Sequence, residues 1–307
     1  MSISPLLQFL NEPIAAACGV RLLLWRDDLA HPDLPGNKAR KLKHNLAAAR
    51  QQGHRVLLTF GGAYSNHIAA VAAAGRLFGF QTIGLIRGDE PAPGTALNPT
   101  LARAAADGMK LHYLDRTAYR RRAEPEFLAG VLAEFGPAYM LPEGGTNGLA
   151  LPGCAELVAE IRQQVAFDAL AVAVGTGGTL AGLLTGLVGT EQAVGVAALK
   201  NGSFLRGEID ELTQSATGRI YANYSVQTDY HCGGYARYSA DLLAFIARFR
   251  QRHGVLLDPI YTGKLLFGVL DLLAQGYFAS GSTVVAIHTG GQQAWAGWEA
   301  RFGPVPD

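Results

Sequence analysis

The sequence predicts an α/β protein built on open, mostly parallel sheets flanked by helices, and three observations lead to this fold class. Runs rich in Val, Ile and Leu alternate with segments of helical length, which is typical of parallel α/β architecture. The chain has 307 residues, about twice the usual length of one domain, which suits two compact units or one large sheet. Apolar residues make up 49% and charged residues 17%, a balance that favours a large buried core over disorder.

Five strands and eight helices are predicted from this alternation. Two polar stretches rich in Pro and Gly, 87–99 and 142–153, are candidate seams between units, and no repeat or low-complexity tract is present. The predicted strands are 55–60, 81–86, 168–174, 193–199 and 283–288, and the predicted helices are 38–52, 66–78, 96–107, 117–135, 179–188, 238–252, 264–275 and 291–301.

Charge and cysteine content argue against several classes of protein. The formal net charge is +1, so no general field attracts nucleic acid or an anionic membrane surface. The three cysteines are far apart and the eight histidines lack metal-ligand spacing, so we expect no metal site and a reducing, cytoplasmic setting. The first 19 residues lack the basic start of a signal peptide.

The stretch 169–189 carries no charge and is just long enough for a membrane helix. Its many glycines favour a different interpretation, namely a buried strand, a loop and a close-packed helix. We therefore expect no membrane segment. The glycines stand at positions 175, 177, 178, 182, 186 and 189.

Glycine is the unusual component, at 38 of 307 residues. Four times along the chain, the pattern indicates a strand that runs into a short loop containing glycine and then into a helix: the loops are residues 61–67, 143–147, 175–179 and 288–291. At the carboxyl edge of a parallel sheet, helix N-termini present unpaired N–H groups, and ligands bind there. Tight turns alone could explain one such loop, but four of them favour a ligand cleft.

The loop at 175–179 is a candidate phosphate cradle. Gly175 and Gly177 are followed by Leu180 where a dinucleotide fingerprint needs a third glycine, and the next strand leads to Lys200 instead of an acid. Gly263-Lys264 lacks the other residues of a P-loop. The loop therefore suits a single phosphate monoester better than NAD or ATP.

A basic cluster at residues 36–43 begins another predicted helix, with Asn37 as a suitable N-cap. Cations are unfavourable at a helix N-terminus, and a solvated basic face is the ordinary explanation. A nearby phosphate together with a lysine that forms an imine would also explain the cluster. Pyridoxal phosphate combines an aldehyde, a phosphate and an electron-accepting ring in one cofactor.

Five short motifs occur in order along nearly the whole chain: Gly36-Asn37-Lys38-x-Arg40-Lys41-Leu42, Ser65-Asn66-His67, Gly175-Thr176-Gly177-Gly178-Thr179-x-Ala181-Gly182, Asp258-Pro259-x-Tyr261-Thr262-Gly263-Lys264 and His288-Thr289-Gly290-Gly291. As a set they resemble the 1-aminocyclopropane-1-carboxylate deaminase / D-cysteine desulfhydrase family. The resemblance implies a two-domain pyridoxal-phosphate enzyme of fold type II, the tryptophan-synthase-β type, in which each domain is an open, mostly parallel twisted sheet. It further implies a large cofactor domain of residues 1–45 and 151–307, a small mobile domain of residues 46–150, and a homodimer.

The resemblance also implies roles for individual residues. Lys38 would form the imine with the cofactor and move the Cα proton, and a desolvated amine beside a cationic ring suits this task. Without the resemblance, His67, Tyr235 and Tyr261 would each more often be structural residues. The implied set is Lys38, Ser65, Tyr235 and Tyr261 for catalysis; Lys38, Asn66, Thr176, Gly177, Gly178, Thr179, Thr262 and Thr289 for the cofactor; and Tyr64, Ser65, His67 and Gly145 for the substrate.

Two positions separate the branches of this family. The deaminase branch has Glu where this chain has Thr262, and Leu where it has Thr289. A carboxylate keeps the pyridine nitrogen protonated, whereas a threonine hydroxyl can donate to an unprotonated nitrogen and leaves a weaker electron sink. A weaker sink suffices when Cβ carries a good leaving group. We therefore expect α,β-elimination from a small amino acid, with D-cysteine going to pyruvate, ammonia and hydrogen sulfide.

Departures from the family pattern leave the substrate open. Tyr64 stands where members often have Gln, and Gly61-Gly62 and Glu143 also differ from the familiar desulfhydrases. Another small D- or L-amino acid with a β leaving group is an alternative. So are 1-aminocyclopropane-1-carboxylate deamination, D-serine or threonine dehydration, and a non-catalytic pyridoxal-phosphate protein in which Tyr64 fills the pocket.

Overall fold

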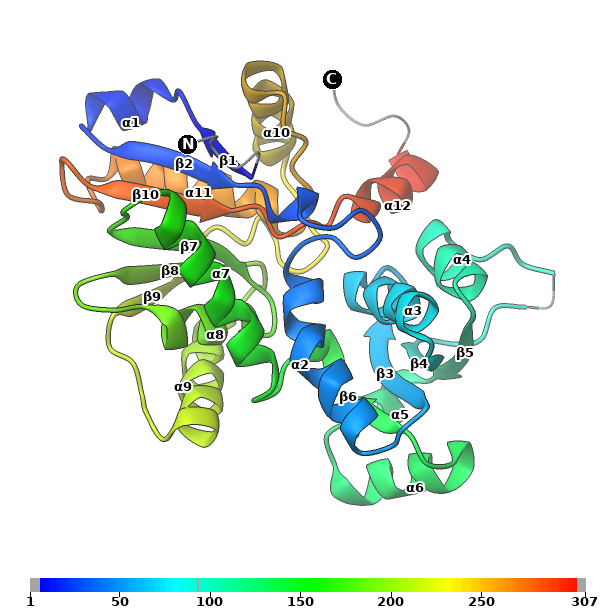
Figure 1. The fold of residues 1–307 in the computed structure, drawn as a ribbon. Coiled ribbons are helices and arrows are strands. Elements are labelled where there is room, and N and C mark those ends of the chain that lie inside the picture. The colour runs from blue at the N-terminus through cyan, green and yellow to red at the C-terminus, as the bar shows by residue number, and fades with distance from the viewer. Residues whose placement is uncertain (1–5, 93, 303–307) are drawn as a thin grey trace.

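The computed structural model describes residues 6–92 and 94–302 and contains two sheets that lie side by side (Figure 1). The larger sheet has the strand order β1-β2-β10-β7-β8-β9, and all of its pairs are parallel except β1 with β2. In its centre, Val285 of β10 pairs with Leu23 of β2 and with Leu170 of β7. These strands are β1 Leu7–Phe9, β2 Arg21–Trp25, β7 Ala169–Val174, β8 Gln192–Ala197, β9 Tyr224–Gln227 and β10 Thr283–Ile287.

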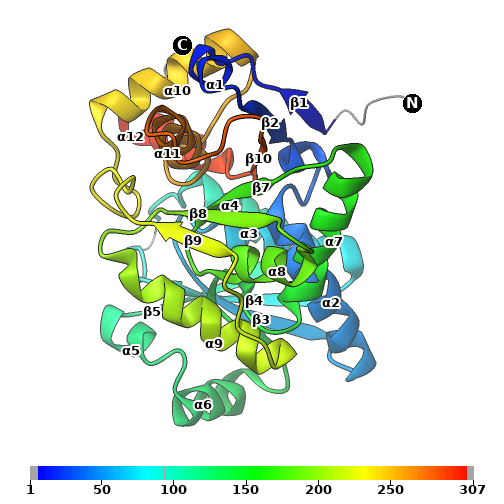
Figure 2. The same cartoon turned by 90° about the vertical axis from the view of Figure 1, so that its left-hand side faces the viewer.

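Helices cover both faces of the larger sheet (Figure 2). One face packs against α1, α10 and α11, and the other against α7, α8 and α9. Strand β7 is buried along its whole length because both of its faces meet helices. The helices are α1 Pro13–Ala17, α7 Ala150–Gln164, α8 Gly178–Gly186, α9 Leu205–Thr217, α10 Ala240–His253 and α11 Thr262–Ala274, with short 3-10 turns η1 Asp27–Leu29 and η3 Gly202–Phe204.

The smaller sheet is entirely parallel, in the order β5-β4-β3-β6. One face packs against α2, α3 and α4, and the other against α5 and α6. Its elements are α2 Asn37–Gln51, β3 Val56–Gly62, α3 Asn66–Phe78, β4 Gln81–Arg87, α4 Pro99–Ala106, β5 Met109–Leu114, α5 Arg116–Arg120, α6 Pro125–Phe135, β6 Tyr139–Leu141 and η2 Glu143–Gly145.

The predicted α/β class is confirmed, and all five predicted strands are present. The prediction of one continuous helix over 117–135 is wrong. The segment forms two helices, because α5 ends at Arg120 and Pro125 begins α6. The charge-free stretch forms β7, a loop and α8, as expected. No helix within the described residues is long and apolar enough to span a bilayer.

Helix α2 lies between the two sheets (Figure 1). Leu42, Leu46 and Ala49 enter the core of the smaller sheet, while the opposite side packs on α7 of the larger one. The predicted boundary between residues 45 and 46 falls inside this helix, and both the boundaries and the mobility of the smaller unit stay predictions.

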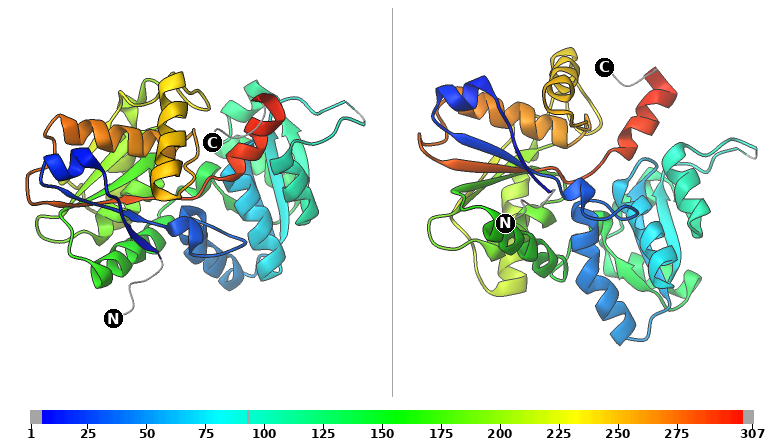
Figure 3. Two further views of the ribbon diagram at one scale, coloured as in Figure 1. Left: turned by 90° about the horizontal axis from the view of Figure 1, so that it is seen from above. Right: turned by 45° about the horizontal axis from the view of Figure 1, so that its top comes forward.

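The C-terminal helix α12, Gln293–Phe302, follows β10 but reaches across to α4 of the smaller unit (Figure 3). Residues 1–5 and 303–307 of the predicted large domain lie outside the described residues. The chain thus passes from the larger unit to the smaller one at α2, returns before α7, and contacts the smaller unit again through α12.

The close contact of α2 with α7 requires glycine at position 153, because a Cβ there would overlap the carbonyl oxygen of Arg40. We expect Gly153→Ala to destabilise the protein by roughly 1–3 kcal/mol through overpacking. Gly207→Ala in α9 is the matched control, since nothing lies within 4 Å of its Cβ position, and it should stabilise by up to about 1 kcal/mol. Urea unfolding measures both, and an unchanged midpoint for Gly153→Ala would contradict the packing argument.

Candidate functional site

A cavity of about 360 Å³ opens between the two sheets, at the carboxyl ends of β3 and β7. It collects residues from motifs that are far apart in the chain, as expected where parallel strands end and helices begin. Of the predicted site residues, its lining includes Lys38, Ser65, Asn66, His67, Thr176, Gly177, Gly178, Thr179, Tyr235, Tyr261 and Thr289.

Lys38 lies in the first turn of α2, facing the cavity. The turn before it requires glycine, because Gly36 has φ +71° and a Cβ there would overlap the carbonyl oxygen of Thr289. The Lys38 ammonium lies 3.4 Å from the carbonyl oxygen of Gly144. Burial lowers the pKa of Lys38 to about 8, so a substantial fraction is a neutral, nucleophilic amine under mildly alkaline conditions.

Arg40, on the other side of the same helix turn, fixes α2 to the larger unit. Its guanidinium donates to the fully buried carboxylate of Asp27 at 2.7 Å and to Glu160 of α7 at 2.8 Å. Removing the guanidinium would leave the Asp27 charge buried and unpaired, which is strongly unfavourable. This arrangement sets the position of Lys38 relative to the larger sheet.

The loop 175–179 joins β7 to α8 and has the form of an anion cradle. Gly177 adopts φ +75° at the N-cap of α8, and the Asn37 side chain donates to Thr179 Oγ1 at 2.7 Å. A Cβ on Gly178 would lie 2.7 Å from Thr146 Oγ1, so glycine keeps this corner open. Free N–H groups at a helix N-terminus favour a phosphate in this place.

Lys41 places its side-chain amine at the same corner, and the sequence analysis missed its role. Its side chain is 1% exposed, donates to Thr146 Oγ1 at 2.7 Å, and would lie 3.0 Å from a Cβ on Gly178. Desolvation, and then the charge of Lys38, holds the pKa of Lys41 well below its ordinary value. No ion pair joins it to a carboxylate within the described residues, so an anionic group of a ligand fits here. The spacing of three residues from Lys38 was the available signal.

The loop after β3 carries Ser65, Asn66 and His67. Ser65 is the N-cap of α3, and its hydroxyl accepts from the backbone N–H groups of His67 and Ile68 at 3.2 and 3.3 Å. His67 is 2% exposed and hydrogen-bonds Thr59 through Nε2 at 2.8 Å. Desolvation and then the neighbouring lysines hold the pKa of His67 well below its ordinary value, so its ring is neutral.

The two predicted phenols meet at the opposite wall of the cavity. The ring centroids of Tyr235 and Tyr261 lie 6.2 Å apart, and a side-chain hydrogen bond, in which either hydroxyl could be the donor, joins the two residues. Desolvation and then the neighbouring Tyr235 raise the pKa of Tyr261 well above its ordinary value. Tyr261 therefore remains a protonated donor near neutral pH.

Three predicted site residues do not line the cavity, and their proposed roles stay predictions. Tyr64 points to α12, since a Cβ on Gly297 would lie 2.6 Å from its ring. Gly145 packs against the ring of His67, since a Cβ built on Gly145 would lie 3.0 Å from Cε1 of that ring. The Thr262 hydroxyl is fully buried, donates to Asp258 at 2.5 Å and accepts from the Asp258 backbone N–H at 2.8 Å.

A group at the mouth of the cavity was also missed from sequence. Arg122 pairs with Glu143 at 2.7 Å, and the Tyr119 hydroxyl donates to the same carboxylate at 2.9 Å. The Arg87 guanidinium stacks over Tyr119 at 5.6 Å. Glu143 was noted only as a departure from a motif, and the two arginines lie in no motif that could have pointed to them.

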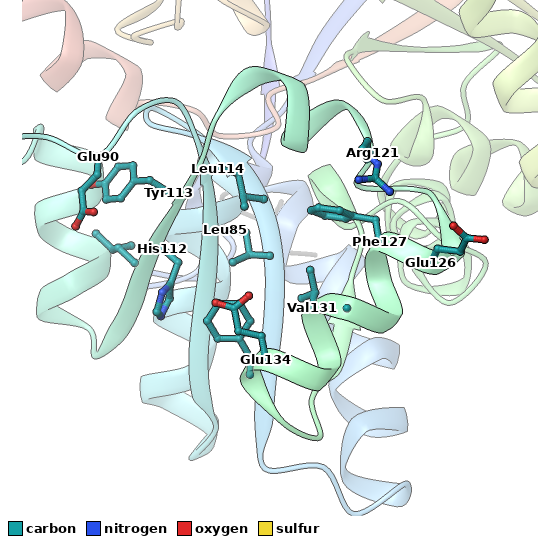
Figure 4. A pocket seen from close by; sticks show the side chains of 13 residues that line it. Leu85, Glu90, His112, Tyr113, Leu114, Arg121, Glu126, Phe127, Val131 and Glu134 are labelled. Carbon is teal, nitrogen blue, oxygen red and sulfur yellow. The ribbon is translucent and has the colours of Figure 1, made fainter.

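A second, larger cavity of about 520 Å³ lies between β5 and α6 (Figure 4). Its walls carry Glu90, Glu126 and Glu134, together with His112, whose ring packs edge-on against Phe135. It contains none of the motif residues, so volume alone does not locate the site. Within the described part of the chain, no three His, Cys, Asp or Glu side chains form a metal-binding group.

The chain belongs to the family of pyridoxal-phosphate dependent enzymes, whose model matches residues 4–290. Its cofactor is pyridoxal phosphate and its two-sheet α/β fold is fold type II. The family accounts for the buried amine of Lys38 and the glycine loop in one cavity.

Relatives with two different names resemble the chain. A putative 1-aminocyclopropane-1-carboxylate deaminase of Pyrococcus horikoshii is 32% identical and covers 91% of this chain and 86% of its own length. A D-cysteine desulfhydrase of Klebsiella pneumoniae is 30% identical, with coverages of 90% and 88%. The crystal structure of an ACC deaminase homologue superimposes with a TM-score of 0.81 at 30% identity and covers 93% of this chain and 88% of its own.

We expect Lys38 in cofactor-free protein to react with a small aldehyde and borohydride at lower pH than ordinary lysines do. Its folded-state pKa of about 8 means that the neutral amine appears as pH rises through 8, whereas exposed lysines ordinarily titrate near pH ~10.4. Peptide mass spectrometry gives the reductive methylation rate of each lysine against pH, with the exposed Lys43 as internal reference. Superimposable profiles for Lys38 and Lys43 would contradict the expectation.

Proposed function

We propose that the protein catalyses α,β-elimination from a small amino acid with a β leaving group, and that D-cysteine goes to pyruvate, ammonia and hydrogen sulfide. The observation that carries this proposal is the threonine hydroxyl of Thr289 on the cavity wall, where the deaminase branch has an apolar side chain. Asp258, the carboxylate beside Thr262, is fully buried and accepts from Thr262 and from three backbone N–H groups. Each of its two oxygens already accepts two hydrogen bonds, so it has no acceptor capacity left for the N–H of a protonated ring nitrogen.

The residues fit the cofactor of the family. Lys41 and the loop 175–179 would hold its phosphate, Asn66 and Thr289 would contact its ring, and Lys38 would receive its aldehyde. When bound, pyridoxal phosphate supplies an imine carbon and an electron-withdrawing ring. The buried amine of Lys41, which a bound anion would favour in its protonated form, and the corner kept open by Gly178 are the structural support for this placement.

The protein's own groups divide the remaining work. The Lys38 amine, with its lowered pKa, can take the proton that Cα loses in the elimination, which a lysine with an ordinary pKa does poorly at neutral pH. The N-terminus of α3 at Ser65 and Asn66 would bind the substrate carboxylate. Tyr261 is held protonated, and with Tyr235 as the donor in the hydrogen bond between the two phenols, the proton of Tyr261 stays free to be donated to the departing sulfur.

We also propose a cytoplasmic homodimer with a mobile smaller domain. Support comes from the family resemblance and from Cys18, Cys154 and Cys232, which are all free thiols as a reducing compartment requires. Light scattering of the purified protein measures the oligomeric state, and a monomeric mass would contradict the dimer.

Deamination of 1-aminocyclopropane-1-carboxylate is the second candidate, because relatives of similar identity carry that name. Elimination of water from D-serine or threonine is chemically close, since Tyr261 can protonate a leaving hydroxyl. The non-catalytic alternative required Tyr64 to fill the pocket. Because Tyr64 packs against α12 instead, that alternative has lost its supporting observation.

We expect holoenzyme to release sulfide and pyruvate from D-cysteine faster than it releases keto acid from L-cysteine, D-serine or 1-aminocyclopropane-1-carboxylate. Lys38→Ala should remove the imine absorbance and lower the rate by at least about 100-fold, because it removes both the imine and the proton carrier. Lys43→Ala on the exposed side of α2 is the control. Faster turnover of aminocyclopropane carboxylate would move the protein to the deaminase branch, and full activity in Lys38→Ala would overturn the mechanism.

The two threonines should respond differently to the same isosteric change. Thr289→Val should leave stability unchanged, shift the absorbance of bound cofactor and lower kcat about five- to tenfold, the value of one neutral hydrogen bond. Thr262→Val should lower the free energy of unfolding by about 1–3 kcal/mol, because the buried Asp258 carboxylate loses a donor. Absorbance spectra and urea unfolding separate these outcomes, and an unaltered spectrum in Thr289→Val would contradict the assignment.

A further inference from the structure

Lys264 is a fully buried lysine that the proposed mechanism does not use. It lies in the first turn of α11, and its side chain has no measurable exposure. Its ammonium donates to two backbone carbonyl oxygens, Gly234 at 2.7 Å and Ala198 at 3.1 Å. Within the described residues no carboxylate forms an ion pair with it, so a buried charge is held by main-chain oxygens.

The Gly234 carbonyl belongs to a strained turn, residues 231–237, which we call the Tyr235 turn. Cys232 and Ala236 both adopt positive φ, at 49° and 53°, which is uncommon for residues other than glycine. Gly234, directly before Tyr235, has φ +117°. Such conformations persist only when surrounding contacts enforce them, and they concentrate at functional sites.

The hydrogen bonds inside this turn are local. Gly234 N–H donates to the His231 carbonyl at 3.0 Å, and Arg237 N–H donates to the Gly234 carbonyl at 3.1 Å. Lys264 reaches the same carbonyl from another element, through the interior of the protein. The ammonium therefore ties the strained turn to α11.

The second partner links the turn to the phosphate loop. Ala198 follows β8, and its N–H donates at 2.9 Å to the carbonyl of Val174, the last residue of β7 before the loop 175–179. One ammonium thus joins the turn that carries Tyr235 to the strand ends that carry the anion cradle. Tyr261, three residues before Lys264, is hydrogen-bonded to Tyr235 on the cavity side of the same junction.

We propose that Lys264 is a positioning residue that holds the Tyr235 turn, and with it the Tyr235–Tyr261 pair, at a fixed distance from the phosphate loop. The ammonium lies among main-chain carbonyl oxygens, and Lys264 is not one of the residues that line the cavity. This inference rests on the proposed function only in assigning the tyrosine pair to the elimination step. Burial lowers the pKa of Lys264 to about 8, so it remains charged at pH 7.

The test uses holoenzyme of Lys264→Met, which keeps the length of the side chain and removes its donors. We expect kcat at pH 7 to fall at least about tenfold, since small misplacements of reacting groups have effects of this size, while cofactor content stays unchanged. Lys200→Met, an exposed lysine beside the same turn, should leave kcat unaltered. An unchanged kcat in Lys264→Met would overturn the proposal.

A double-mutant cycle shows whether Lys264 acts through Tyr235. In a Tyr235→Phe background, Lys264→Met should cause little further loss, because the positioned hydroxyl is already absent. Equal losses in both backgrounds would overturn the proposed route. Propylammonium should restore part of the kcat of Lys264→Ala, whereas 1-propanol, which has a similar volume but no charge, should not; equal effects of the two would contradict the role of the charge.

Hydrogen exchange gives a readout that needs no activity. The amides of the Tyr235 turn should exchange at least about tenfold faster in Lys264→Met than in wild type, while those of α10 stay unchanged. If the wild-type enzyme eliminates no substrate but exchange of the turn amides still increases in Lys264→Met, the proposed function is wrong while the role of Lys264 in holding the Tyr235 turn is supported. If neither variant folds, wild-type exchange decides, because turn amides as fast as those of an exposed loop would overturn the proposal.

Discussion

The guanidinium of Arg40 is the contact on which the placement of the site depends. It joins the buried Asp27 of η1 and Glu160 of α7 to helix α2, whose opposite face forms part of the core of the smaller sheet. A single helix is thus fixed to one unit by charge and to the other by apolar packing. Because Lys38 and Lys41 both lie on this helix, the position of the helix places both side chains at the junction of the two sheets.

Placing the site at this junction explains how a nearly neutral chain concentrates positive charge. Lys38 and Lys41 share one helix face, and the N-termini of α3 and α8 point to the same space. Three carboxylates around this junction are already engaged: Asp27 and Glu160 by Arg40, and Glu143 by Arg122 and Tyr119. The unsatisfied part of the site therefore calls for an anion, which the phosphate of the family's cofactor provides.

The sequence predicted the fold and the meeting of the motifs because parallel strands end at one edge of a sheet. It could not predict directions of side chains within a loop. Tyr64 and Ser65 are neighbours, yet the first turns to α12 and the second caps α3. Thr262 and Thr289 looked equivalent until Asp258 was seen to occupy the former. Strands β1 and β6 have only three residues and leave too little pattern to detect, whereas the break before Pro125 was readable in advance.

The tryptophan residues, two of which lie in helix α12, are distributed unevenly between the two units. Two of the three tryptophans, Trp295 and Trp298, lie on this helix and the third, Trp25, lies in β2, so residues 46–150 contain no indole. Trp295 donates to the Leu257 carbonyl of the larger unit at 3.0 Å, while the same helix covers Tyr64 beside the capping Ser65. Intrinsic tryptophan fluorescence therefore reports on the larger sheet and on α12. It does not report on the interior of the smaller sheet.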